Sequence, residues 1–324
     1  MNGPQQAGLT LEQIREAHVR IKESIHRTPV MTSCTLDAAC GATLFFKCEN
    51  FQKAGAFKAR GATNAVFSLP AHQLEHGVAT HSSGNHGAAL ARAARLRGVP
   101  ATVVMPDNAP QAKRESVERY GGRIVFCAPT LEAREHALER VLADTGASPI
   151  HPYNDLRVMA GQGTAAVELI ESVADLDVIL CPVGGGGLLS GVAVAAKGLN
   201  AAIRVIGVEP AAADDAARSL QAGRIMPSVN PRTIADGLRA SLGDKTFAEI
   251  RRHVDAIVTV SEESIVDAMR RIWEVMKILV EPSGAVAYAA LVEANADLRG
   301  KRVGLLLTGG NLDLDNLPWI QAKA

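Results

Sequence analysis

Residues 178–191 read Val-Ile-Leu-Cys-Pro-Val-Gly-Gly-Gly-Gly-Leu-Leu-Ser-Gly, a β-rich apolar run followed by four consecutive glycines and the start of an Ala-rich stretch. This pattern is typical of a buried strand that turns directly into a helix. A turn without Cβ atoms lets consecutive backbone N–H groups close on an anion at the positive end of the helix. We interpret Gly184, Gly185, Gly186 and Gly187 as a phosphate-binding turn; a tight packing turn is the alternative.

The same alternation of a short apolar run and a helical stretch recurs along the chain. The expected strands are Val78–His81, Ala101–Met105, Arg123–Cys127, Val178–Val183, Arg204–Val208, Ile257–Val260 and Val303–Leu307. This order predicts an α/β fold with parallel sheets and right-handed crossovers. We expect two three-layer α/β/α domains with mostly parallel sheets. The small one is an inserted domain of residues 78–148, and the large one comprises residues 1–77 and 149–324.

Composition narrows the class of protein. The chain has 324 residues, with 34 Lys and Arg against 34 Asp and Glu, so its balanced charge favours neither nucleic acid nor a membrane surface as a partner. Its 5 cysteines are scattered and lack CxxC spacing, which indicates reduced thiols. The N-terminus has no apolar signal segment, and Thr10 with Gln13 predicts a capping box that opens a helix. We expect a soluble, cytoplasmic protein.

Three further turns carry candidate chemistry. The turn His81–Gly87 offers hydroxyls, an amide and N–H groups that suit a carboxylate, or it caps a helix in the ordinary way. Lys58 follows an apolar, glycine-containing stretch in which desolvation would make its amine nucleophilic, although a solvated lysine is the alternative. Thr308 ends a strand before a glycine turn, where its hydroxyl can face a ligand.

Taken together, these segments resemble the fold-type II pyridoxal-phosphate (PLP) enzymes, specifically the serine/threonine dehydratase and serine racemase family. The matching stretches, in the family's order, are FFKCENFQKAGAFKARGA from residue 45, THSSGNHG from 80, HPYNDLRVMAGQGT from 151, PVGGGGLLSG from 182, VEPAAADD from 208, IADG from 234 and LLTGGNLD from 306. The resemblance covers about residues 28–313, and several independent motifs in one order are far more specific than a single glycine loop.

The resemblance implies roles for individual residues. Lys58 matches the lysine that forms an imine with PLP, and Phe57 precedes it beside the pyridine ring. Asn85 matches the residue that binds the ring hydroxyl, and the four glycines match the phosphate cradle. Thr308 matches the position that faces the pyridine nitrogen. A neutral hydroxyl there makes the ring a weaker electron sink than a carboxylate would, which fits dehydration and racemisation better than transamination.

The resemblance also implies how the substrate and a metal bind. The turn Ser82, Ser83, Gly84, Asn85 and His86 would hold the substrate carboxylate, Lys58 would remove the Cα proton, and Ser83 would serve as acid or base on the opposite face. Arg134 matches an arginine that can approach a second carboxylate, with a solvated helix residue as the alternative. Glu209, Ala213 and Asp215 match a site for Mg²⁺ (or Ca²⁺ or Mn²⁺), with an acidic helix start as the alternative.

The implied function is that of a PLP-dependent ammonia-lyase. It would eliminate the β-hydroxyl of 3-hydroxyaspartate, L-serine or L-threonine to give a keto acid and ammonia. Serine or aspartate racemisation with side dehydratase activity is the alternative within the family. A nucleotide-binding module is the alternative outside it, but this leaves Lys58, Asn85 and Thr308 unexplained. The chain ends soon after LLTGGNLD, so we expect no regulatory domain, and we expect a homodimer from the resemblance.

Overall fold

The computed structural model describes residues 8–82, 84–293 and 298–320, and contains a six-stranded and a four-stranded sheet. The larger sheet has the order β1-β2-β10-β7-β8-β9, and the smaller has the order β5-β4-β3-β6. The strands are β1 (Val30–Met31), β2 (Thr43–Cys48), β3 (Val78–His81), β4 (Ala101–Pro106), β5 (Arg123–Cys127), β6 (Ser148–Pro149), β7 (Val178–Pro182), β8 (Arg204–Pro210), β9 (Ala256–Val260) and β10 (Arg302–Leu307). Neighbouring strands pair in parallel, except for β1 with β2.

Helices follow most of the strands. They are α1 (Leu11–Ile21), α2 (Cys34–Cys40), α3 (Lys58–Ser68), α4 (Ala71–Leu74), α5 (Asn85–Leu96), α6 (Gln111–Arg119), α7 (Leu131–Thr145), α8 (Leu156–Ser172), α9 (Gly187–Leu199), α10 (Asp215–Ala222), α11 (Asp244–His253), α12 (Glu262–Arg271) and α13 (Pro282–Val292). Short 3₁₀ segments include η1 (Glu49–Phe51) and η4 (Asp236–Leu238).

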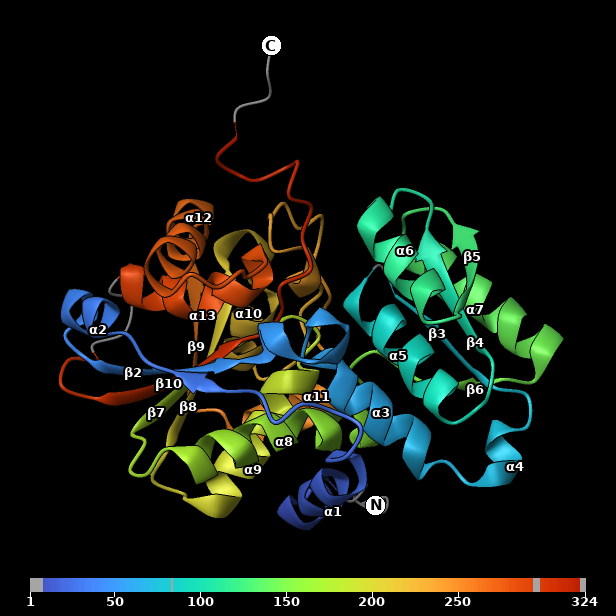
Figure 1. The fold of residues 1–324 in the computed structure, drawn as a ribbon, viewed down its shortest axis with the longest axis horizontal. Coiled ribbons are helices and arrows are strands. Elements are labelled where there is room, and N and C mark those ends of the chain that lie inside the picture. The colour runs from blue at the N-terminus through green and yellow to red at the C-terminus, as the bar shows by residue number, and fades with distance from the viewer. Residues whose placement is uncertain (1–7, 83, 294–297, 321–324) are drawn as a thin grey trace.

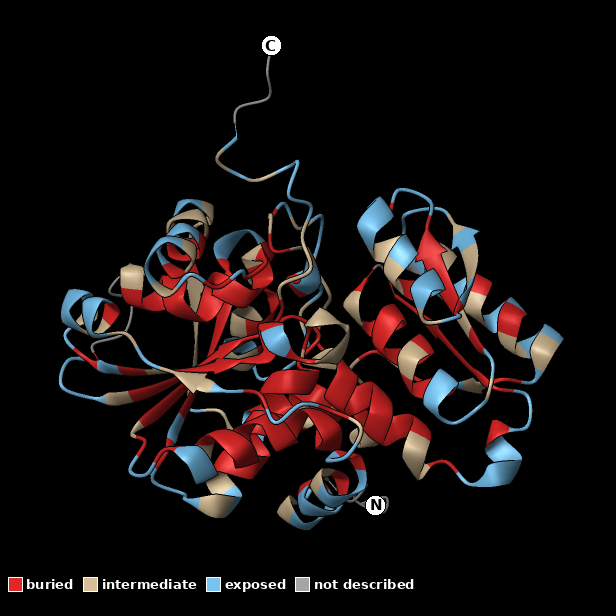
Figure 2. Cartoon of the chain, viewed as in Figure 1, coloured by how far each residue is buried: buried red, intermediate tan, exposed pale blue. Residues whose placement is uncertain are grey.

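The larger sheet, with its helices, forms a large domain of three layers. Helices α2, α12 and α13 cover one face, and α8 and α9 cover the other, with α1 and α11 packed outside them (Figure 1). Each face has its own apolar core, one around Phe46 and Tyr288 and the other around Ile14 and Leu189. Figure 2 shows that the buried residues gather along this sheet and its covering helices.

The smaller sheet, with α5 and α6 on one face and α7 on the other, forms a small domain. Helix α3 joins the two domains, because it packs against α5 on one side and against α8 on the other (Figure 1). The carboxyl ends of the parallel strands and the start of α3 therefore meet at the junction of the two domains, which is where such sheets place ligands.

The predicted α/β class with mostly parallel sheets is confirmed, and the predicted strands match within two residues. Thr10 and Gln13 form the capping box at the start of α1. Strand β2 was not predicted as a strand, because its buried residues Phe46 to Cys48 lack alternation. The four-stranded sheet runs from residue 78 to residue 149, while the exact domain boundaries stay a prediction.

Two further expectations concern the cysteines and membranes. Cys34, Cys40, Cys48, Cys127 and Cys181 are all free thiols. Within the described part of the chain, every helix is too short or too polar to cross a bilayer.

Candidate active site

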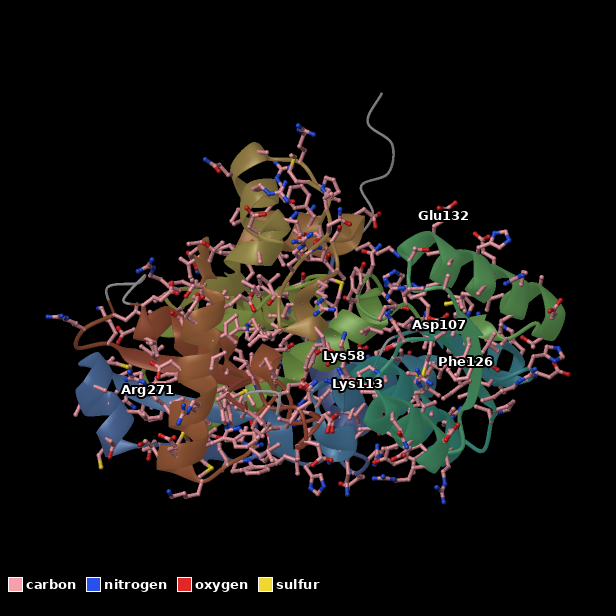
Figure 3. The ribbon with its side chains drawn as sticks, turned by 90° about the horizontal axis from the view of Figure 1, so that it is seen from above. Lys58, Asp107, Lys113, Phe126, Glu132 and Arg271 are labelled. Carbon is pink, nitrogen blue, oxygen red and sulfur yellow. The ribbon has the colours of Figure 1, made fainter. Side chains whose placement is uncertain are left out.

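Lys58 is the first residue of α3 and lies at the junction of the two domains (Figure 3). Its Nζ donates a hydrogen bond of 2.9 Å to the carbonyl of Pro152 and lies 5.1 Å from the centroid of the Phe57 ring. Burial lowers the pKa of the amine to about 8, because the charged form loses hydration. The amine is therefore poised near neutral pH for nucleophilic or base chemistry.

The end of β10 holds the segment before Lys58 in place. Ala56 pairs with Gly309 in an isolated bridge, and the Phe57 N–H donates to the Thr308 carbonyl at 3.0 Å. The Thr308 hydroxyl is buried and donates to the carbonyl of Ser283 at 3.2 Å. The structure thus places Thr308 beside Phe57 and gives this position a neutral hydroxyl.

The four glycines form the turn between β7 and α9. An added Cβ would lie 2.8 Å from Leu238 at Gly184, 2.5 Å from the Tyr153 ring at Gly185 and 2.9 Å from Tyr153 at Gly187. Gly186 has a positive φ of 88° and is the N-cap of α9, which has no side-chain cap. The first N–H groups of α9 are thus left for another acceptor, and the turn fits a phosphate.

Tyr153 links the glycine turn to Lys58. It follows Pro152, whose carbonyl accepts a hydrogen bond from the Lys58 amine. The Tyr153 ring packs against Gly185. The Tyr153 and His151 rings meet edge to face at 4.5 Å, and His151 meets His81 in the same way at 5.7 Å. Burial lowers the pKa of both His81 and His151 to about 4, so these rings are neutral near pH 7.

Asn85, at the start of α5, is tied to the large domain. Its Nδ2 donates to Glu281 Oε1 at 2.8 Å, and its Oδ1 accepts from Asn311 Nδ2 at 3.0 Å. Glu281 is buried, and burial raises the pKa of its carboxyl to about 7. Sequence reasoning missed Glu281, which reads as an ordinary acidic residue before the N1 proline of α13.

The rest of the predicted carboxylate turn has mixed roles. Ser82 Oγ accepts from the N–H groups of Gly84 at 3.2 Å and Gly87 at 3.1 Å, so its hydroxyl caps α5. His86 is buried, and neither ring nitrogen makes a hydrogen bond of standard geometry. Burial holds the pKa of His86 well below its usual range. Ser83 lies outside the described residues.

Arg134 lies in the first turn of α7, where its Nε donates to the Thr130 carbonyl at 3.3 Å. Its guanidinium adds to the lowering of the pKa of His81, after burial itself, so Arg134 is within electrostatic reach of the histidine cluster. The structure leaves Arg134 bonded within its own helix.

The predicted metal ligands come together at the end of β8. Glu209 is buried and accepts from the N–H groups of Ala216 and Ala217, so it also caps α10. Asp215 is buried, and its Oδ2 has no hydrogen-bond partner of standard geometry. Burial raises the pKa of Glu209 to about 8 and that of Asp215 to about 6. Two desolvated carboxylates with a free oxygen fit a cation.

Ala213 lies in the short 3₁₀ segment just before Asp215, so its carbonyl remains a predicted ligand. Among the residues that the structure describes, no group of three or more His, Cys, Asp or Glu side chains is arranged to hold a metal ion.

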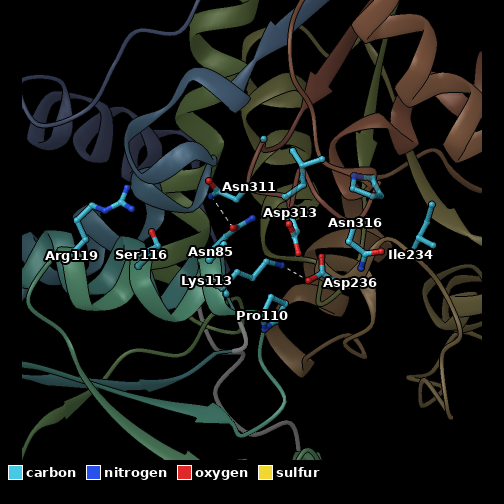
Figure 4. Close-up of a pocket in the computed structure, with 16 residues that line it drawn as sticks. Asn85, Pro110, Lys113, Ser116, Arg119, Ile234, Asp236, Asn311, Asp313 and Asn316 are labelled. Carbon is cyan, nitrogen blue, oxygen red and sulfur yellow. Dashed lines mark hydrogen bonds and ion pairs between the residues drawn. The ribbon is translucent and has the colours of Figure 1, made fainter. Parts of the chain in front are cut away.

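A cavity of about 410 Å³ opens beside Asn85 at the domain junction. Small-domain residues of α5 and α6 line one side, and the segment after β10 lines the other (Figure 4). Across it, Lys113 of α6 pairs with Asp236 of η4, and Asn85 bonds Asn311. The cavity is thus lined by both domains and shares Asn85 with the site around Lys58.

Comparison with known proteins agrees with this geometry. Residues 21–309 match the family model described as "Pyridoxal-phosphate dependent enzyme". The β-hydroxyaspartate dehydratase of Paracoccus denitrificans is 53% identical over 310 residues, which cover 96% of this chain and 98% of that protein. The serine racemase of Arabidopsis thaliana is 52% identical over 316 residues, covering 96% of this chain and 95% of that one.

Solved structures show the same fold. Maize serine racemase superposes with a TM-score of 0.93 at 49% identity, covering 95% of each chain. The threonine deaminase of T.th. superposes with a TM-score of 0.89 at 44% identity, covering 94% of this chain and 99% of that one. From this similarity, and from a buried amine held beside a glycine turn and a neutral hydroxyl, the chain belongs to the pyridoxal-phosphate-dependent enzyme family, in its fold-type II branch of dehydratases and serine racemases.

Proposed function

We propose that this enzyme is an ammonia-lyase that eliminates the β-hydroxyl of a hydroxy amino acid to give a keto acid and ammonia. The candidate substrates are 3-hydroxyaspartate, L-serine and L-threonine. The observation that carries the proposal is the buried Lys58 amine, whose pKa is lowered to about 8. It donates a hydrogen bond to the carbonyl of Pro152, and the next residue, Tyr153, packs on the glycine turn.

We infer that four groups hold the cofactor. Lys58 supplies the amine that bonds to it, the glycine turn supplies N–H donors for its phosphate, and Asn85 and Thr308 supply side chains for its ring. PLP, when bound, withdraws electrons from the substrate's Cα and so makes the Cα proton removable. Thr308 offers an uncharged hydroxyl, which supports elimination and racemisation over transamination.

The chain's own residues then carry the proton. The lowered pKa of the Lys58 amine leaves a substantial neutral fraction near pH 8 to accept the Cα proton. The positive end of α5 suits the substrate carboxylate. The neutral histidines His81 and His151 keep this part of the site free of competing positive charge.

Among the substrates, 3-hydroxyaspartate is favoured by two observations. The Paracoccus denitrificans relative is named for it, and the positive charge of Arg134 is within electrostatic reach of His81, which supports a second carboxylate on that side. Serine racemisation is the second candidate, because serine racemases are 52% identical or less over nearly the whole chain. Ser83 would be the acid or base on the opposite face in that case.

We further propose a homodimeric, cytoplasmic enzyme that binds Mg²⁺, or Ca²⁺ or Mn²⁺, through Glu209, Ala213 and Asp215. The two buried carboxylates of Glu209 and Asp215 support the cation, because buried charges need a compensating partner. Incubation with a chelator is expected to lower both activity and the thermal unfolding midpoint, and added Mg²⁺ to restore them, while Asp215→Asn should abolish the response. Activity and unfolding that are indifferent to the chelator would contradict the metal site.

The test of the function combines one variant with a substrate panel. Lys58→Ala should abolish the visible absorption of the bound cofactor and turnover, while Lys22→Ala, at an exposed position just after α1, should change neither. Ammonia release and Cα stereochemistry are measured together for L-serine, L-threonine and the 3-hydroxyaspartate isomers. An unaltered spectrum and rate in Lys58→Ala would overturn the assignment of Lys58. Inversion without ammonia release would favour the racemase.

A further inference from the structure

Four charged side chains are buried together behind α3. Lys47 of β2, Glu49 of η1, Arg60 of α3 and Glu168 of α8 are each no more than 2% exposed. They are two cations and two carboxylates, so the cluster is neutral as a whole. Charges this deep are tolerated only when each is paired and hydrogen-bonded.

Arg60 lies at the centre of the cluster and holds both carboxylates with two contacts each. Its Nε and Nη2 donate to Glu49 at 2.7 and 2.8 Å, and its Nη1 and Nη2 donate to Glu168 at 2.8 and 2.7 Å. Its Nη1 also donates to Thr164 Oγ1 at 3.0 Å. A planar guanidinium with this many fixed contacts has a single orientation.

Lys47 belongs to the same cluster without touching α3. Its Nζ donates to Glu168 at 2.6 Å and to the Thr28 carbonyl at 2.7 Å. The Thr28 hydroxyl donates to Glu49 at 2.6 Å. Lys47 and Thr28 therefore pair with the two carboxylates from the side of β2. Of the four charged residues, only Arg60 belongs to α3, the helix that carries Lys58.

Arg60 and Lys58 project from opposite sides of the first turn of α3. Two residues correspond to about 200° around a helix. The contacts that hold the Arg60 guanidinium therefore also fix the rotation of α3 about its axis, and with it the direction of the Lys58 side chain. On the side of α3 that carries Arg60, the backbones of α3 and α8 are in close contact. An added Cβ on Gly61 would lie 2.7 Å from the Val158 carbonyl, and one on Gly161 would lie 2.6 Å from the Gly61 Cα.

We propose that Arg60 is a positioning residue for Lys58. Its contacts with Glu49 and Glu168 fix the roll of α3 about its axis, so that the amine meets the cofactor and the substrate at a productive distance. The proposal rests on Lys58 being the cofactor lysine, and it is independent of which amino acid is the substrate.

The test compares Arg60→Lys with Lys47→Met. Lysine keeps the positive charge but cannot hold two carboxylates in two fixed pairs, so α3 loses its defined roll. Lys47→Met disturbs the same buried carboxylate from β2. Three quantities are measured: the thermal unfolding midpoint, kcat and KM, and the rate at which the visible band forms when PLP is added to the apoprotein without substrate.

Both variants should lower the unfolding midpoint. Only Arg60→Lys should slow band formation, by about 10-fold or more, and lower kcat by roughly 10- to 100-fold with KM within about 2-fold. Band formation and kcat within about 2-fold of wild type in Arg60→Lys, or equal losses in Lys47→Met, would overturn the proposal. A wild-type protein that forms no band would instead refute Lys58 as the cofactor lysine.

A gentler pair decides the question if Arg60→Lys does not fold. Thr164→Val removes one contact of Arg60, and Thr28→Val removes one contact of Glu49 outside α3. Band formation is expected to slow by about 2- to 5-fold in Thr164→Val alone. Equal rates in the two valine variants would refute positioning through Arg60.

Discussion

The amine of Lys58 has a lowered pKa although no cation is hydrogen-bonded to it; burial alone moves the pKa from 10.5 to about 8. The neutral, reactive form should therefore increase as pH rises through about 8. We predict that acylation of Lys58 in the apoprotein, followed by peptide mass spectrometry, has its midpoint near that pH. Lys22, exposed just after the end of α1, is the internal reference for exposed amines. A midpoint for Lys58 near about 10.4, the value of lysine in model peptides, would contradict the desolvated site.

The same shift affects stability. Because the folded pKa lies below the unfolded one, the unfolded chain binds more protons between about pH 8 and 10.5, and the contribution of Lys58 to the folding free energy improves as pH rises through that window.

Motifs supplied the candidate cofactor residues, since Lys58, Asn85 and Thr308 each stand in a short recognisable stretch. Glu281 could not be found that way, and Tyr153 stands in the matching stretch from residue 151 without a role assigned to it. Their importance comes from the fold, which brings Glu281 to Asn85 and the Tyr153 ring to Gly185. Capping by Ser82 was the ordinary alternative in the sequence, and only the folded structure shows that its oxygen accepts from two N–H groups.

At the level of elements, the turn from β7 to α9 depends on the absence of a side chain at Gly185. A Cβ there would lie 2.5 Å from the Tyr153 ring, which is itself held against His151. We predict that Gly185→Ala raises the dissociation constant for PLP by about 10- to 100-fold, or about 1.4–2.8 kcal/mol. The measurement is a spectroscopic titration of the apoprotein.

Gly223→Ala is the control for that turn. Gly223 has a positive φ of 67° with no atom near its Cβ position, so the substitution costs about 1 kcal/mol of backbone strain and should leave PLP affinity unchanged. If both variants bound PLP as wild type does, the glycine turn would not be the phosphate cradle.

Elements with strong periodicity or turn signals were predictable, and those fixed by tertiary pairing were not. The strands before glycine turns were found within two residues, because β-branched runs bounded by glycine are distinctive. Strand β1 and strand β6 have two residues each and exist only through their partners β2 and β3. A strand of two residues is too short to have a sequence pattern that predicts it.

At the level of the whole molecule, few polar contacts join the two domains across the cavity. The pair Lys113–Asp236 is partly exposed, at 11% and 33%, so it is worth only about 0.5–1 kcal/mol and is screened by salt. We predict that Lys113→Ala raises KM about 2- to 5-fold while kcat changes less. The wild-type KM should approach that of the variant between about 0.05 and about 0.5 M NaCl.

The salt dependence separates this effect from loss of folding. A variant whose KM kept the wild-type salt dependence would show that the pair does not hold the domains together. The sequence could not show this contact, because Lys113 and Asp236 are distant in the chain and only Asp236 stands in a matching stretch, IADG.

Strand β10, residues 302–307, lies between β2 and β7 in the middle of the six-stranded sheet. During synthesis, the ribosome adds this strand after all the other strands of the sheet. The six-stranded sheet therefore cannot be completed until translation has passed residue 307. Until then, the edges of β2 and β7 that pair with β10 have unpaired backbone N–H and C=O groups. The four-stranded sheet is contiguous from residue 78 to 149 and has no such delay. A nascent chain stopped before β10 would accordingly depend on chaperones for one domain and not for the other.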